Sequence, residues 1–210
     1  MALVVPTITA ENTHQYREQV ERVSGFAKHL HVDIMDGIFA PSNSFDLELL
    51  WLPEDITCDI HIMYQEPEQT FDELTKLNIR TIIIPAEVDV NFRKLSQKVR
   101  KEGKHFGVAL LAETTVESAK KAIEASDHVL IFSGNLGYQG GSTADLELLS
   151  KVAEIRAINS KAEIGWDGGV SDQNIKQIAE AGVEVINTGG FVHHSSKPLE
   201  SYRSLQQQIS

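Results

Sequence analysis

The stretch HLHVDIMDG (residues 29–37) decides the interpretation of the fold, because it joins the apolar pattern of a buried strand to several polar side chains. Side chains two positions apart on a strand share a face, so His31, Asp33 and Met35 point together. In a parallel barrel the inward face is normally apolar, and functional groups gather at the carboxyl ends of the strands. We therefore expect this strand to lead into a functional site.

A second strand carries the same pattern. TCDIHIM (57–63) places Asp59, His61 and Met63 on one face. Asp59 comes earlier in its strand than His61, so we expect it to lie deeper and to support the groups at the strand end from behind. Two successive strands thus bring histidine, aspartate and methionine toward one place.

Further apolar runs alternate with segments of helical periodicity. NFRKLSQKVRKEG (91–103) and SDQNIKQIAEAG (171–182) predict helices, the second with Ser171 as its N-cap, while the least regular helix prediction surrounds FDLELLWL (45–52). The other predicted strands are LVVPTI (3–8), RTIIIP (80–85), HFGVALL (105–111), HVLIFS (128–133), AEIGW (162–166) and VEVINT (183–188).

Strand and helix alternate eight times in 210 residues, which gives about 26 residues per unit, near the lower limit for a TIM (β/α)8 barrel. No linker or low-complexity segment interrupts residues 1–210. We therefore predict an α/β protein that forms one (β/α)8 barrel domain over 1–210. An open doubly wound sheet is the structural alternative.

Composition argues against several classes of partner. Nineteen Lys and Arg against thirty Asp and Glu give a net charge of −11, which repels nucleic acid and anionic membranes. Cys58 is the single cysteine, so an internal disulfide is impossible and a small core residue is expected. We find no signal-peptide pattern and no apolar run long enough to span a membrane, and we expect a cytoplasmic protein.

A third polar strand end follows AEIGW, where Asp167 precedes two glycines. With His31, Asp33 and His61, it could supply two nitrogens and two carboxylates to one divalent ion, and this donor set suits Zn, Fe, Mn or Co better than Ca. Each residue alone has a plainer interpretation, as a hydrogen-bonded core histidine or a turn carboxylate. Their convergence at strand ends favours a shared function.

Three glycine-rich loops follow the last three strands: SGNLGYQGG (133–141), DGG (167–169) and TGG (188–190). Glycine lets the backbone approach an anion, and TIM barrels commonly bind phosphate with the loops after strands seven and eight. These loops therefore predict a phosphate site without Lys or Arg. We expect His193 and His194, which follow, to be a solvated pair at the start of a helix.

HVDIMDG (31–37), DIHIM (59–63), WDGGV (166–170) and the early PTI (6–8) resemble the ribulose-phosphate 3-epimerase family, in that order and across nearly the whole chain. The resemblance implies a TIM-barrel isomerase of the pentose phosphate pathway that interconverts ribulose 5-phosphate and xylulose 5-phosphate by proton transfer at C3, through an enediolate stabilised by one divalent metal ion. It also implies a small-molecule sugar phosphate as the partner, and a homo-oligomer.

The resemblance also implies site residues. His31, Asp33, His61 and Asp167 match the metal ligands, and Asp33 and Asp167 match the catalytic acid/base pair. The residues that match the substrate site are Thr7, Met35, His61, Met63, Gly137, Tyr138, Gln139, Gly140, Gly168, Gly169, Gly189 and Gly190.

The chain also departs from the family pattern. Phe132 stands where a third methionine is typical, Thr7 replaces a serine, and NPGFGGQ reads NLGYQGG (135–141). GHF becomes GIF (37–39), and the glycine-serine of the last loop becomes Gly189–Gly190. These changes touch substrate and phosphate contacts and leave the four metal ligands intact.

The departures keep alternative functions open. One is a 3-epimerase of another ketose phosphate such as allulose 6-phosphate, and another is a noncatalytic sugar-phosphate binder on the same barrel. Related barrels that decarboxylate or condense sugar phosphates use an Asp-x-Lys-x-x-Asp strand end, and the matching region here has no lysine.

Overall fold

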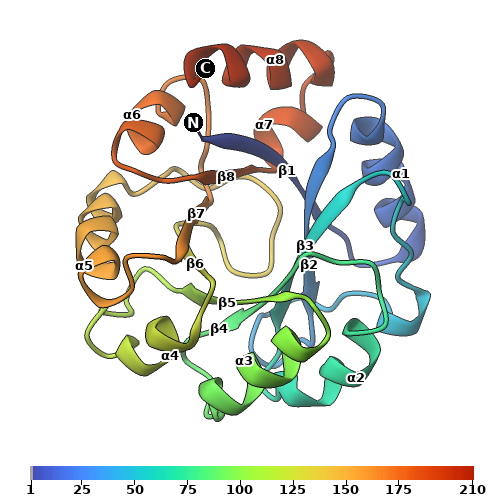
Figure 1. Ribbon diagram of the computed structural model, residues 1–210. Helices are drawn as coiled ribbons and strands as arrows, with labels where there is room; N and C mark the ends of the chain where they lie inside the picture. The colour runs from blue at the N-terminus through green and yellow to red at the C-terminus, as the bar shows by residue number, and fades with distance from the viewer. Residues whose placement is uncertain (1) are drawn as a thin grey trace.

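A computed structural model describes residues 2–210 and shows a closed barrel of eight parallel strands in which each strand pairs with its neighbours in sequence order (Figure 1). The strands are β1 (Leu3–Thr9), β2 (His29–Met35), β3 (Thr57–Met63), β4 (Thr81–Pro85), β5 (His105–Leu110), β6 (His128–Phe132), β7 (Glu163–Asp167) and β8 (Val185–Thr188). The predicted strands and the predicted barrel are confirmed, and the open sheet is excluded because β1 pairs with β8.

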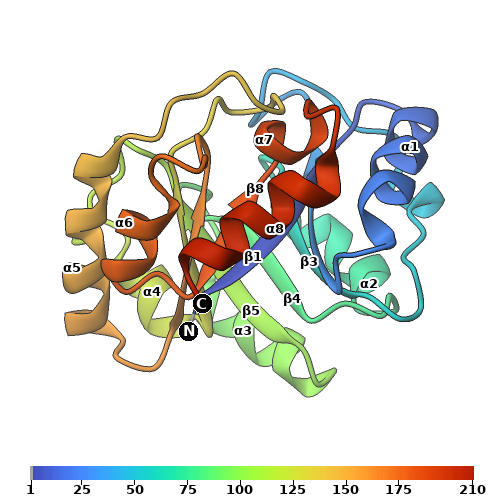
Figure 2. The ribbon, with the colours of Figure 1, turned by 90° about the horizontal axis from the view of Figure 1, so that it is seen from above.

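Helices surround the barrel (Figures 1 and 2). The α-helices are α1 (Thr13–Ser24), α2 (Phe71–Leu74), α3 (Phe92–Lys101), α4 (Lys120–Ala125), α5 (Ser150–Ile158), α6 (Ile175–Glu180), α7 (Gly190–His193) and α8 (Pro198–Gln208), and the 3₁₀ turns are η1 (Leu47–Leu49), η2 (Pro67–Thr70) and η3 (Leu146–Leu149). No helix among residues 2–210 is long and apolar enough to cross a membrane.

Two helix predictions need correction. The segment 45–52 forms only η1, because its apolar residues follow no helical period and Pro53 comes directly after it. The helix expected from Ser171 begins at Ile175, with Asn174 as its N-cap residue. Ser171 instead starts a turn in which its backbone N–H donates to the side chain of Asn174.

The apolar core lies between the barrel and its helices. Outward-facing strand residues such as Ile8, Ile34 and Ile62 are fully buried there. Inward-facing residues fill the barrel axis, where Ile83, Ala109 and Leu130 form a small separate cluster. The apolar filling is thus confined to part of the interior, which leaves the carboxyl ends of the strands free for polar groups.

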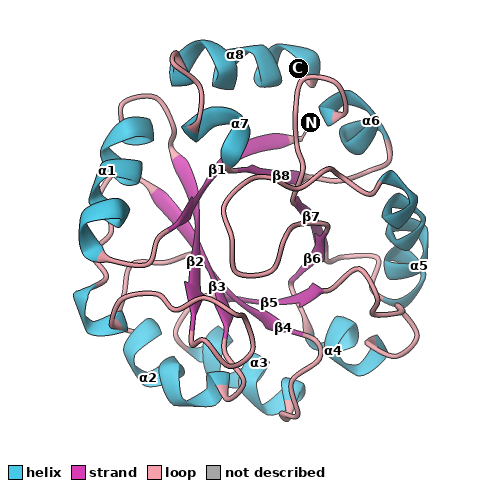
Figure 3. Ribbon diagram, turned by 180° about the vertical axis from the view of Figure 1, so that it is seen from behind, coloured by secondary structure: helices cyan, strands magenta, loops and turns pink. Residues whose placement is uncertain are grey.

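The register places the polar residues in rows around the barrel. Thr9 of β1 lies beside Asp33 of β2, which lies beside His61 of β3. On the other side, Asp167 of β7 lies beside Asn187 of β8. In Figure 3 the long connection after β6 curves across this end of the barrel.

Candidate active site

Two histidines and two aspartates meet at the carboxyl ends of β2, β3 and β7. Nδ1 of His61 lies 3.2 Å from Oδ1 of Asp33, and Nε2 of His31 lies 3.4 Å from the same oxygen. Oδ2 of Asp167 lies 3.7 Å from Nε2 of His31. All four side chains are buried, so the constellation predicted from separate strand ends is brought together in space.

These donors fit a divalent cation. Metal bonds of about 2.0–2.2 Å to imidazole nitrogen and carboxylate oxygen place neighbouring ligand atoms about 3–3.5 Å apart, close to the separations seen here. One ligand atom each from His31, Asp33 and His61 lies within 4.8 Å of the others. Nε2 of His31 is buried and has no hydrogen-bond partner among residues 2–210, as expected for an atom whose partner is a metal.

The pKa values of the two carboxylates are shifted in opposite directions. Burial acts to raise the pKa of Asp33, but a hydrogen bond with His61 and charge interactions with His31 and His61 outweigh it and lower that pKa well below its usual range. Burial, together with the nearby charge of Asp33, raises the pKa of Asp167 well above its usual range. Two carboxylates whose environments push their pKa values apart are typical of an acid/base pair.

Thr9 holds the second oxygen of Asp33. Its hydroxyl donates a hydrogen bond of 2.8 Å to Oδ2, so both oxygens of Asp33 contact polar side chains. The Thr9 backbone is fixed in turn by Gln19 of α1, whose side chain accepts from its N–H and donates to its carbonyl. Sequence reasoning missed Thr9, although the alternation of Thr7 and Thr9 on one strand face could have indicated it.

A cavity of about 560 Å³ opens above this cluster. Thr7, Asp33, Met63 and Asp167 line its inner end, and no Lys or Arg of the described chain lines it. The predicted glycine-loop residues line the rest, namely Gly137, Tyr138, Gln139, Gly140, Gly168, Gly169, Gly189 and Gly190.

Three of the predicted site residues do not line the cavity, namely His31, His61 and Met35. The histidines lie beneath its inner end among the carboxylates. Met35 packs with Met63 and Ala40 in a small apolar cluster and supports the wall that Met63 forms.

The glycine loops after β6 and β7 contact each other through their backbones. Gly168 and Gly169 both have positive φ angles, 112° and 67°. A Cβ atom at Gly168 would lie 2.2 Å from the backbone nitrogen of Gly134, and one at Gly169 would lie 2.0 Å from that of Ala144. Any side chain at these two positions would therefore collide with the loop after β6, which lines the cavity.

Two departures from the family pattern are linked by contact. A Cβ atom at Gly190 would lie only 2.9 Å from Cα of Gly140, so the loop after β6 occupies the place of a side chain at position 190. The same loop is fixed to β1 because the amide of Gln139 donates to the carbonyl of Thr7 and to Gln19, at 2.9 Å each.

Phe132 takes part in the wall of the cavity. Its ring centroid lies 6.0 Å from that of His61, and a Cβ atom at Gly134 would lie 2.9 Å from its ring. The aromatic ring thus fills the space beside His61, next to Asp167 in the strand register.

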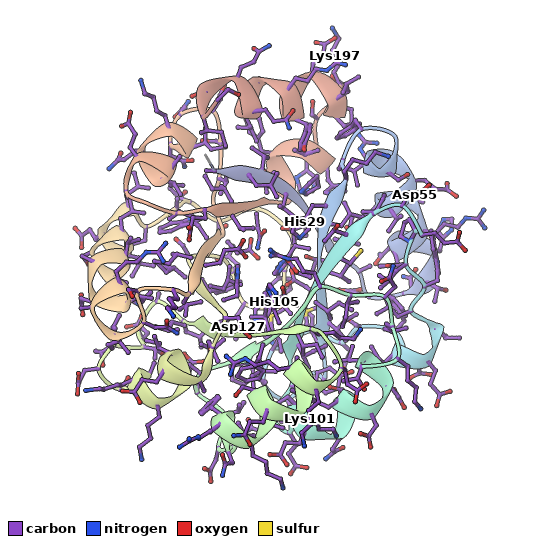
Figure 4. All side chains as sticks on the ribbon, in the orientation of Figure 1. His29, Asp55, Lys101, His105, Asp127 and Lys197 are labelled. Atoms are coloured by element: carbon purple, nitrogen blue, oxygen red, sulfur yellow. The ribbon has the colours of Figure 1, made fainter. Side chains whose placement is uncertain are left out.

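The role expected for Asp59 is wrong. Among the described residues it makes no hydrogen bond to His31 or His61, and it accepts from His29 at 2.7 Å and from Nη2 of Arg80 at 2.6 Å. Arg80 also binds Glu163, which accepts from His128 at 2.8 Å. These residues form a polar network across the amino-terminal end of the barrel, the end around which Figure 4 labels His29.

The prediction for the histidine pair is half wrong. His194 is exposed and borders the cavity, but His193 is buried at the end of α7, with 7% of its surface exposed. Burial lowers the pKa of His193 to about 4, so it is neutral at pH 7. The short helix α7 turns it toward the core, which the glycines before it did not reveal.

The (β/α)8 barrel, with carboxylates and histidines grouped at the carboxyl ends of its strands, places this protein in the class of TIM-barrel enzymes, and this group is its candidate active site. A sequence model of the Ribulose-phosphate 3 epimerase family matches residues 3–193. The chain belongs to the ribulose-phosphate 3-epimerase family, and it is an isomerase that acts on carbohydrate phosphates.

Individual relatives agree. Ribulose-phosphate 3-epimerase from Helicobacter pylori (strain J99) is 30% identical over 97% of this chain and 96% of its own length. The enzyme of that name from Mycobacterium tuberculosis (strain H37Rv) is 29% identical over 98% of this chain and 92% of its own.

Solved structures support the fold alone. A structure of KGPDC from Streptococcus mutans has a TM-score of 0.73 at 12% identity, covering 99% of this chain and 97% of that chain. The 3-hexulose-6-phosphate synthase from Salmonella typhimurium has a TM-score of 0.71 at 15% identity, covering 100% of this chain and 98% of that one.

Proposed function

We propose that this enzyme interconverts ribulose 5-phosphate and xylulose 5-phosphate by moving a proton at C3 between Asp33 and Asp167. The observation that carries the proposal is the convergence of both carboxylates with His31 and His61 at the inner end of one cavity. Family membership supports the same reaction.

Inversion at C3 needs one group to remove a proton from one face of the carbon and another to return a proton to the opposite face. Asp33 and Asp167 come from β2 and β7, on different sides of the barrel, and both line the cavity. One carboxylate takes the C3 proton, the other carboxyl group gives one back, and their roles exchange in the reverse direction. The net reaction consumes no oxidant or reductant.

His31, Asp33, His61 and Asp167 would hold one divalent metal ion, with Zn, Fe, Mn and Co all compatible with the donor set. A cation bound there supplies positive charge that stabilises the enediolate left when the C3 proton departs. Without a cation, the acidic groups at the inner end would repel an anionic sugar phosphate.

The outer part of the cavity suits the phosphate. Its glycine-rich lining at Gly168, Gly169, Gly189 and Gly190 exposes backbone to the cavity. At the inner end, Thr7 has a buried hydroxyl with no partner among residues 2–210, which is free to contact the substrate. The thioether of Met63 faces the inner end without offering a proton, so it can contact the planar enediolate without quenching it.

A second candidate reaction is 3-epimerisation of a ketohexose 6-phosphate such as allulose 6-phosphate. This candidate is motivated by Gly190, which stands where the family pattern has a serine. The backbone of Gly140 lies where a side chain at position 190 would be, so one polar group beside the predicted phosphate site is absent. A noncatalytic sugar-phosphate binder is the third candidate, and it predicts binding without exchange of the C3 proton.

The test compares both sugars at equal concentration, with protein whose metal content has been measured. We expect a higher kcat/KM for ribulose 5-phosphate, and loss of activity in a chelator. A higher value for allulose 6-phosphate would transfer the proposal to that substrate, and binding of either sugar without turnover would support the noncatalytic alternative.

We further infer that the enzyme works in the cytoplasm as a homo-oligomer and binds neither nucleic acid nor membranes. The net charge of −11 supports the last two points, and the family supports the others. Size-exclusion chromatography with light scattering measures the oligomeric state directly.

A further inference from the structure

Asn187 is a buried polar side chain that the proposed reaction does not yet use. It lies on β8, lines the cavity and is 1% exposed. Neither Nδ2 nor Oδ1 of its amide has a hydrogen-bond partner among residues 2–210. Its neighbours on the strand, Val185 and Ile186, are apolar, so an apolar residue would suit this position if packing alone mattered.

A buried amide without partners is unfavourable, because it has given up its hydrogen bonds to water. Such groups in a folded protein call for an explanation, and a ligand that binds in the adjoining cavity supplies one. An amide offers one acceptor and two donor hydrogens, which matches a hydroxyl group that both donates and accepts.

The position of Asn187 indicates which hydroxyl of the substrate it would contact. In the strand register it lies directly beside Asp167, the proposed acid/base at C3. Two residues further along the chain comes Gly189, which belongs to the predicted phosphate loops. In a pentulose 5-phosphate, the carbon between the reacting centre and the phosphate-bearing carbon is C4.

We propose that Asn187 binds the C4 hydroxyl of the substrate and sets the preference of the enzyme for the configuration at that carbon. This inference rests on the proposed function, since it assumes that C3 lies at Asp167 and the phosphate at the glycine loops. Asn187 acts by binding, and it takes no part in moving the C3 proton.

The experiment uses D-xylulose 5-phosphate as substrate and L-ribulose 5-phosphate, which differs from it only at C4, as competitor. The inhibition constant of the competitor divided by the KM of the substrate measures discrimination at C4, even if the competitor is not turned over. The variant is Asn187→Leu, which keeps the shape of the side chain and removes its amide.

Thr188→Val is the matched control. Thr188 is the next residue of β8, its hydroxyl is also buried without a partner in the described chain, and it does not line the cavity. Because neighbouring strand residues face opposite sides, this substitution removes an unpaired polar group without touching the cavity.

We expect Asn187→Leu to raise KM and to narrow discrimination at C4 by about tenfold, with a smaller effect on kcat. The unfolding temperature of the ligand-free variant should be equal to that of the unmodified protein or higher, because an unpaired buried amide has been removed. Thr188→Val should leave discrimination at C4 unchanged.

Unchanged discrimination in an active Asn187→Leu enzyme would overturn the inference and leave the proposed function standing. If Asn187→Leu does not fold, Asn187→Ser keeps a smaller donor and acceptor, and it should retain more discrimination than Asn187→Ala. Equal discrimination by these two variants would also overturn it. Inactivity of the unmodified, metal-loaded enzyme on D-xylulose 5-phosphate would refute the proposed function itself, and the inference with it.

Discussion

The hydroxyl of Thr9 donates a 2.8 Å hydrogen bond to Oδ2 of Asp33, while His61 and His31 contact the other oxygen, Oδ1. Oδ1 of the same carboxylate lies 3.2 Å from His61. Asp33 is therefore fixed from both sides, and the strand register that puts Thr9, Asp33 and His61 in one row is what fixes it. The orientation of the proposed base thus depends on β1 as well as on its own strand.

Removing that hydroxyl should slow catalysis more than it weakens substrate binding. Thr9→Val keeps the branched shape of the side chain but leaves Oδ2 of Asp33 without its donor, and we expect kcat to fall about tenfold with little change in KM. Thr9→Ser restores the donor and should recover most of the rate. Steady-state kinetics of the two variants, with equal metal content, decide this; equal rates in both would exclude an orienting role.

Each proposed acid/base residue should be indispensable. Asp33→Asn and Asp167→Asn keep the shape of the side chain but can no longer take and return a proton, so we expect each to lower kcat by about 10³-fold or more. Circular dichroism should show folded protein in both cases. A near-normal rate in either variant would remove that residue from the mechanism.

Metal removal should be visible without any substrate. A cation that binds the folded site and not the unfolded chain raises the unfolding temperature, so a chelator should lower that temperature and readdition of Mn, Co, Zn or Fe should restore it. His61→Gln provides the control, because a chelator should shift its unfolding temperature much less. Identical shifts in both proteins would place the bound metal elsewhere.

Phe132 should tune the reaction without being essential. It fills the space beside His61 and lines the cavity, but it carries no group that binds a proton or a metal. Phe132→Met exchanges one apolar wall for another, and we expect kcat/KM to change less than about tenfold. Complete loss of activity in folded protein would mean that the aromatic ring has a role that this account omits.

The network at the amino-terminal end of the barrel should make stability depend on acid pH. Burial acts to raise the pKa of Glu163, but hydrogen bonds from His128 and Arg80 outweigh it and lower that pKa from 4.5 to about 2. Because the folded pKa is the lower one, ionised Glu163 stabilises the fold above about pH 4.5, and this contribution is lost as the pH falls toward about 2.

Chemical unfolding of Glu163→Gln measures this contribution. At pH 7 we expect the variant to lose about 1–2 kcal/mol, a figure reduced because the side chain is 31% exposed, and the difference from the unmodified protein should shrink below pH 4.5. Glu18→Gln, at an exposed ion pair with His14, should behave like the unmodified protein throughout. A difference that does not vary with pH would contradict the assignment.

Much of the fold could be predicted because its main signal is local. Apolar runs bounded by turn residues marked each strand, and β3 begins and ends where the pattern placed it, at Thr57 and Met63. The segment after β2 could not be predicted in the same way, because apolar residues crowd FDLELLWL on all sides and leave no periodic face.

The residues of the candidate site likewise fall into those that the local sequence predicts and those whose role depends on their neighbours in space. His31, Asp33, His61 and Asp167 stood out because polar residues at the ends of apolar strands are unusual. Asp59 was misjudged because its partner Arg80 comes from the residue just before β4, and the two side chains meet only when β3 pairs with β4. Asn187 and Thr9 were missed for a related reason, since their importance lies in which neighbours they have or lack.

The central claim is metal-dependent proton transfer at C3, and NMR of ribulose 5-phosphate in heavy water with metal-quantified enzyme tests it most directly. We expect deuterium to enter at C3 while xylulose 5-phosphate appears, with both stopped by a chelator and restored by metal. The absence of deuterium at C3 in the presence of folded, metal-loaded enzyme would contradict the account.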